Sequence, residues 1–297
     1  MKTALDLAIK WKEKGTLDGG FVLGDRLYER YMDKAEWQAF LQEMQERYPA
    51  AYAAFASGDG NELGLKASNT PPKMACYGSS SRMLYLLARE MDGFSFERQF
   101  PTTIGVGKAN LDGYAETADA RVFVEAKCHE PYDGKAATPS VKYAQLYEYL
   151  TAADFGMRWE NTPLGNGTMR TVVYAQEKRI AYFDVKQMVC HLLGIAADWL
   201  RAPNTKNIRF IYLLFNPGFL SLPQGKKSEE IQKRYRQVCD ECNSIPFGTL
   251  FLNVLKYLRY SSGIGDVSLQ EIEDVSKRFS FALQDQASFI HLRERVK

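Results

Sequence analysis

Three charged residues in the middle of the chain have the types and the spacing of a metal-dependent hydrolytic site. In the segment RVFVEAK the side chains of an extended strand alternate, so Glu125 and Lys127 share one face. The strand is otherwise apolar, and buried charges are costly unless they are paired or bind a cation. Asp112, in NLDGY, is close enough along the chain for a hairpin to bring its carboxylate beside that face. The sequence therefore predicts that these three side chains converge.

The chemistry predicted by this set is phosphodiester hydrolysis. Two neighbouring carboxylates suit a hard cation such as Mg²⁺, which prefers oxygen ligands and usually keeps several water molecules. The cation would polarise the phosphodiester, lower the pKa of an attacking water and offset charge on the leaving oxygen. Lys127 would orient that water or stabilise the transition state.

The elements that must position these residues form a consistent series. A serine-capped helix is predicted over residues 79–91, with Gly93 just beyond its end. Three extended segments follow, at residues 94–103, 109–116 and 121–127, with a turn at 118–120 between the last two. Helices over 140–153 and 183–200 and a buried strand over 208–215 come next. The predicted order is αβββα, then a further helix and strand.

With these motifs, the sequence resembles the PD-(D/E)XK nuclease superfamily over about residues 74–217. Asp112 and the run Glu125-Ala126-Lys127 stand in the motif positions. The resemblance implies an α/β fold of the restriction-endonuclease-like class, with an αβββαβ core and a mixed central sheet flanked by helices. It also implies Asp112, Glu125 and the Ala126 carbonyl as metal ligands, and Lys127 as the catalytic lysine.

The chain departs from the superfamily pattern at two places. Leu111 stands where the family has a proline, and the helix at 79–91 begins with serines where many relatives have a glutamate. A third catalytic acid is therefore open. Glu97, in FSFERQF on the first strand, is the candidate, and Glu90 on the helix is the alternative.

The position of a substrate-binding glutamine is also open. Many superfamily members place one on the helix after the lysine. Gln145 and Tyr149 are four residues apart on one helical face, which resembles the QxxxY pattern of recombination exonucleases. Gln187 is the rival, because it lies at the start of the helix that leads into the strand at 208–215, with His191 one turn on.

The length and the charge of the chain limit which kinds of surface and domain it can have. The chain has 297 residues and a formal net charge of +2, from 38 basic and 36 acidic residues, so any basic surface for a nucleic acid must be local. Residues 1–73 are predicted to be a helical N-terminal extension and linker. Residues 74–297 are predicted to be the nuclease-like domain, with its core at 74–217 and a helical C-terminal part. The C-terminal helices are expected near residues 228–243, 249–260 and 269–283.

The five cysteines are an odd number in a chain without an evident secretory segment, which predicts reduced thiols and a cytoplasmic protein. The apolar runs are shorter than a membrane span, so no membrane partner is expected. The CxxC at Cys239 and Cys242 has no assigned role.

The leading hypothesis is a Mg²⁺-dependent deoxyribonuclease of restriction or repair type, in which Mn²⁺ could replace Mg²⁺. DNA is the expected partner and RNA is left open, as is the choice between exonuclease and endonuclease action. A homodimer would supply the two active sites needed to cut both strands at once. The alternative is a nucleic-acid-binding or assembly module with a degenerate nuclease fold, which the missing helix glutamate favours. A third hypothesis is a partner-binding protein that acts through its N-terminal segment.

Overall fold

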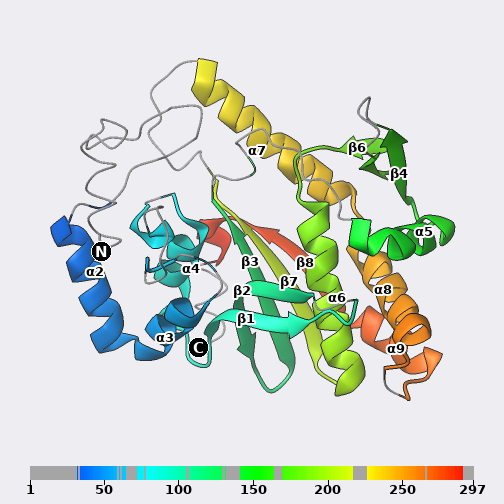
Figure 1. The fold of residues 1–297 in the computed structure, drawn as a ribbon, viewed down its shortest axis with the longest axis horizontal. Coiled ribbons are helices and arrows are strands. Elements are labelled where there is room, and N and C mark those ends of the chain that lie inside the picture. The colour runs from blue at the N-terminus through cyan, green and yellow to red at the C-terminus, as the bar shows by residue number, and fades with distance from the viewer. Residues whose placement is uncertain are drawn as a thin grey trace.

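The computed structural model describes residues 32, 34–58, 60, 62–64, 72–76, 78–104, 107–128, 131, 141–163, 169–216, 226–264 and 266–289. Its centre is a mixed sheet with the strand order β1-β2-β3-β7-β8 (Figure 1). The strands are β1 (Ser95–Pro101), β2 (Lys108–Glu116), β3 (Ala120–Lys127), β7 (Asn207–Leu214) and β8 (Phe279–Gln284). β1, β2 and β3 form an antiparallel meander, whereas β7 is parallel to both β3 and β8.

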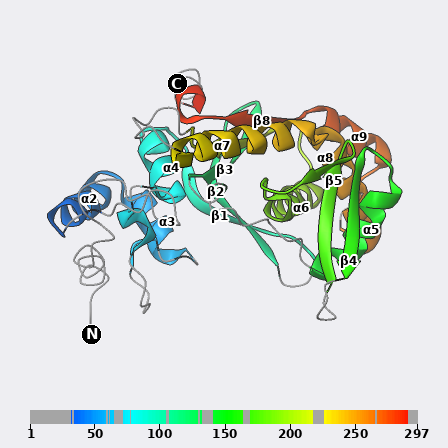
Figure 2. The same ribbon diagram turned by 90° about the horizontal axis from the view of Figure 1, so that it is seen from above.

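Helices cover both faces of this sheet. Figure 2 shows α3 (Pro49–Ser57) and α4 (Ser80–Ala88) on one side, and α6 (Val185–Arg201) and α8 (Phe247–Ser262) on the other. The α/β class with a mixed sheet agrees with the prediction. Helix α6 connects β3 to the parallel strand β7, as a crossover between parallel strands requires.

The face under α6 carries the larger core, here called the α6-side core. Phe123 of β3 and Phe210 of β7 pack there against the buried stripe of α6. Gly194 permits the close approach of this helix, because a Cβ at that position would lie 2.5 Å from Cβ of Ala109 and 3.0 Å from Cβ of Phe100. Other helices that contribute to this core are α5 (Ala144–Ala152), α7 (Lys226–Ser244), α8 and α9 (Leu269–Lys277).

The opposite face carries the α4-side core. Val124 and Ala126 of β3 pack there with Tyr85 of α4. The helix α2 (Lys34–Arg47) and α3 add Trp37 and Phe55 to the same cluster. These two helices agree with the helical character predicted for the N-terminal region, while the predicted helical residues 1–31 lie outside the described residues. The short helix η2 (Lys73–Ala75) completes this layer.

A second, three-stranded sheet lies between α5 and α6 in the sequence and was not predicted. It consists of β4 (Met157–Pro163), β5 (Met169–Ala175) and β6 (Lys178–Ile180), all antiparallel. The β5–β6 turn places Gln176 and Glu177 at φ angles of 48° and 61°. Such turns usually carry asparagine or glycine, and because neither is present here the sequence lacks the usual hairpin signal.

The C-terminal prediction was partly wrong. A helix was expected over residues 269–283, but α9 ends at Lys277 and Phe279–Gln284 form β8. The free edge of β7 pairs with this segment, from Ile208↔Phe279 to Leu213↔Gln284, and these backbone hydrogen bonds decide its conformation. Among the described helices, none is both long and apolar enough to cross a membrane.

Candidate active site

The candidate site lies where β2 separates from β3. Paired residues run from Glu116↔Arg121 to Gly113↔Val124, and the register stops there. Beyond this point the Asp112 side chain provides the hydrogen-bond acceptor, and its Oδ2 accepts the backbone N–H of Ala126 at 2.7 Å. A carboxylate thus occupies the place that a strand carbonyl would fill in a continuing ladder.

The neighbouring strand β1 has an irregular backbone conformation opposite Asp112. The pairing of β1 with β2 passes from Phe96↔Gly113 to Arg98↔Leu111. Between them Glu97 has a φ of 54°, which a residue with a side chain rarely adopts and which costs about 1–3 kcal/mol. The strand changes face there, because Phe96 belongs to the α4-side core whereas Phe100, an even number of residues further along β1, belongs to the α6-side core.

Glu125 lies at the centre of the site and is 1% exposed. Its Oε1 is 2.6 Å from Nζ of Lys127, and its Oε2 is 2.9 Å from Nε2 of His191 on α6. Burial alone would raise the pKa of this carboxyl, but Lys127 and His191 outweigh it and lower the pKa to about 2. Glu125 is therefore ionised at neutral pH.

Asp112 shows the opposite behaviour. Its pKa is raised well above the ordinary value, first by burial and then by repulsion from the Glu125 carboxylate. Glu97 adds a smaller repulsion, while Lys127 and the Ala126 N–H offset part of the effect. The two carboxyl groups are thus close enough to interact strongly, and the lysine is close to both.

The Ala126 carbonyl points to the same side as Asp112. On the other side of β3, the carbonyl of Lys127 accepts the N–H of Phe215 at 2.8 Å, so the peptide groups of Lys127 face β7. Successive residues of a strand alternate their peptide directions, so the N–H and C=O of Ala126 both face β2. The hydrogen bond from Ala126 to Asp112 agrees with this direction.

The four remaining candidate residues lie on different elements around this centre. Glu97 is half-buried and acts electrostatically on Asp112, whereas Glu90 is exposed beyond the end of α4. Gln187 is half-buried in the first turn of α6, where its N–H donates to the N-cap Asp184.

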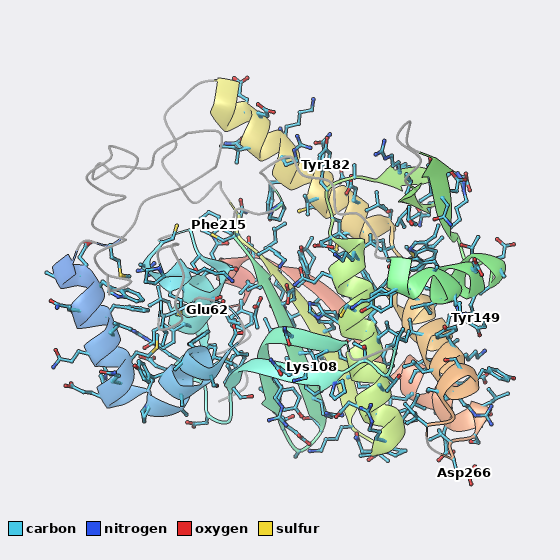
Figure 3. All side chains as sticks on the ribbon, in the orientation of Figure 1. Glu62, Lys108, Tyr149, Tyr182, Phe215 and Asp266 are labelled. Atoms are coloured by element: carbon cyan, nitrogen blue, oxygen red, sulfur yellow. The ribbon has the colours of Figure 1, made fainter. Side chains whose placement is uncertain are left out.

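Gln145 is exposed on α5, a helix that packs on β4 and α8. Figure 3 places Tyr149 of the same helix on the flank of the molecule, away from Phe215, which marks the site end of β3 and β7. Of the two candidate glutamines, Gln187 lies on α6, the helix whose His191 contacts Glu125, whereas Gln145 lies on α5.

Two residues of the site were not assigned a role from the sequence. Tyr212 is the β7 neighbour of Glu125 and is fully buried; burial first, and then the Glu125 and Asp184 carboxylates, raise its pKa well above the ordinary value. His191 was noticed only as one turn beyond Gln187. Neither could be placed from sequence, since the register of β3 with β7 and the position of α6 are tertiary features.

The donor set fits a hard divalent cation. Both oxygens of Glu125 are buried and, despite the two short ion-pair distances, have no hydrogen bond of good geometry within the described part of the chain. Their lone pairs are therefore not taken up by aligned donors. Asp112, Glu125 and the Ala126 carbonyl together offer oxygen atoms of the kind that Mg²⁺ prefers. Over the described residues, no group of three or more His, Cys, Asp or Glu side chains is arranged to hold a metal ion.

No family model matches this chain, and no curated protein or solved structure is significantly similar to it. The function of this protein is therefore inferred from the geometry of the site.

Proposed function

We propose that the protein is a divalent-metal-dependent nuclease that hydrolyses phosphodiester bonds of DNA, with a restriction-endonuclease-like αβββαβ core. The observation that carries the proposal is the meeting of Asp112, Glu125 and Lys127 where β2 and β3 separate. The strand order, with β7 parallel to β3 and reached through α6, supports the same core.

In this proposal each residue has a defined task. Asp112, Glu125 and the Ala126 carbonyl would hold Mg²⁺ or Mn²⁺ through oxygen atoms. A cation held there would polarise the phosphodiester and make a water molecule more acidic. Lys127, whose Nζ is 2.6 Å from Glu125, exchanges that contact for the attacking water or a phosphate oxygen. The low exposure of Glu125 strengthens each electrostatic interaction in the site.

The direct test incubates the purified protein with linear, circular and single-stranded DNA in Mg²⁺, Mn²⁺ or EDTA. Cutting is expected with either metal and none with EDTA. Circular DNA separates endonuclease from exonuclease action, and RNA in parallel reactions tests the substrate class.

Two variants and one control sharpen that test. Asp112→Ala should abolish cleavage, and Lys127→Ala should reduce it by about 100-fold or more. The control is Lys108→Ala, an exposed lysine of β2 that bonds Gln99 at 3.1 Å and should cut at the wild-type rate. A folded Asp112→Ala protein that cuts as fast as wild type contradicts the site assignment.

A second candidate is a nucleic-acid-binding or assembly module with a degenerate site. It is favoured by the ion pair between Glu125 and Lys127, because the lysine already offsets the charge of the carboxylate without a metal ion. Binding of DNA that weakens steeply with salt, without metal-stimulated cutting by the wild type, would support this candidate over the nuclease.

A further inference from the structure

Besides Lys127, the side chain of His191 also contacts the Glu125 carboxylate. Its Nε2 lies 2.9 Å from Oε2, and its side chain is 2% exposed. The contact joins α6 to β3, two elements that are separated by a helix and a complete small sheet in the sequence. Burial of an imidazole at this point is unfavourable unless a polar partner compensates it, and Glu125 is that partner.

The position of His191 is fixed by its helix. Gly194, one turn on, lets α6 approach Ala109 and Phe100, and the Asp184 side chain caps the start of the helix by accepting the N–H of Gln187. The imidazole also packs edge-on against Phe210, with ring centroids 6.0 Å apart. Neither ring nitrogen has a hydrogen bond of good geometry among the described residues, and Nε2 is the nitrogen that lies within ion-pair distance of Glu125.

In the proposed reaction, one of the two contacts of Glu125 must break while the other is kept. Lys127 must leave Oε1 in order to reach the water or the phosphate. When it does, His191 remains as the group that prevents the carboxylate from rotating. Groups of this kind orient metal ligands from outside the coordination sphere, and their loss typically costs about 10–100-fold in metal affinity or activity.

We propose that His191 is a positioning residue that holds the Glu125 carboxylate in the orientation needed for a divalent cation. The inference rests on the proposed nuclease function and assigns His191 no direct contact with the substrate.

The test measures the Kd for Mn²⁺ alone by titration calorimetry, without nucleic acid, on the full-length chain. His191→Leu removes the ring nitrogen that lies beside Oε2 and keeps an apolar side chain, and is expected to weaken Mn²⁺ binding by about 10–100-fold. His191→Gln places an amide nitrogen near the position of Nε2 and is expected to restore most of the affinity. Val189→Ala, a buried neighbour on α6, controls for loss of packing and should leave the Kd unchanged.

The outcomes separate the inference from the nuclease proposal. Equal Kd values for wild type and His191→Leu overturn the inference and leave the nuclease proposal intact. Equal weakening in His191→Leu, His191→Gln and Val189→Ala also overturns it, because packing alone would then explain the loss. A wild-type protein that binds no Mn²⁺ at millimolar concentration overturns both. Circular dichroism of each variant establishes that it is folded.

Discussion

At the scale of single residues, the two carboxyl groups of the site have opposite electrostatic environments. Glu125 is stabilised as an anion by Lys127 and His191, whereas Asp112 is buried beside an anion that is already present. The electrostatic cost at Asp112 reduces the stability of the fold, as is common at functional sites.

Asp112→Asn is predicted to stabilise the metal-free protein at neutral pH while abolishing cleavage. Because the folded pKa of Asp112 is raised, the folded state holds a proton that the unfolded chain has lost, and stability falls as pH rises from about 4 through the folded pKa. The variant lacks this penalty and should melt at a higher Tm than the wild type at pH 8, by a larger margin than at pH 4. Thermal melts at pH 4 and pH 8 measure the difference. A lower Tm than wild type at both pH values would contradict it.

Mg²⁺ is predicted to raise the Tm of the wild type more than that of Asp112→Asn. A ligand that binds only the folded state stabilises it by about 2.7 kcal/mol at a concentration of 100 times its Kd. The asparagine retains an oxygen but no charge, so it should bind the cation weakly. Melts at increasing Mg²⁺, with K⁺ at matched ionic strength as the control, check this expectation; equal shifts in both proteins would place the metal elsewhere.

At the scale of elements, the contact between α6 and the sheet determines whether His191 reaches Glu125. Gly194→Ala is predicted to destabilise the protein by about 1–3 kcal/mol, because its Cβ would overlap Ala109 and Phe100. It should also weaken Mn²⁺ binding, because displacement of the helix moves His191. Urea unfolding and metal titration measure the two effects.

Gly248→Ala is the matched control, because among the described residues no atom outside its own stretch of α8 lies within 4 Å of a Cβ at that position. It should leave metal binding unchanged and stabilise the fold by up to about 1 kcal/mol. If Gly194→Ala were as stable as this control, the close approach of α6 would not be required.

At the scale of the whole molecule, the N-terminal helices form part of the core on the second face of the sheet. Trp37 is 2% exposed and belongs to the same cluster as Val124 and Ala126, whose strand carries the site. Trp37→Ala is predicted to lower the free energy of unfolding by about 3–5 kcal/mol, as for other buried tryptophans. Tyr260→Ala, at a side chain that is 71% exposed, should change it by less than about 0.5 kcal/mol. Denaturant titration compares them, and equal small effects would mean that α2 contributes no packing.

The strands and helices that carry a strong local pattern were predictable from the residues alone. β3 combines alternating side chains with an out-of-place charged pair, and the stripe of α6 and the apolar run of β7 are similarly readable. The meander of β1, β2 and β3 followed from these patterns and from the turn at 118–120. Local periodicity reports the face that each element buries, so these features needed no knowledge of the fold.

The set of side chains that meet at Glu125 depends instead on long-range packing. His191 and Tyr212 come from elements distant in sequence, and their approach depends on helix packing and on the parallel register of β7. The same applies to β8, which pairs with the free edge of β7, and to Asp112, whose carboxylate replaces a strand carbonyl at Ala126. Backbone pairing between distant segments leaves little periodic signal in the residues themselves, because it depends on which edge the rest of the fold leaves open.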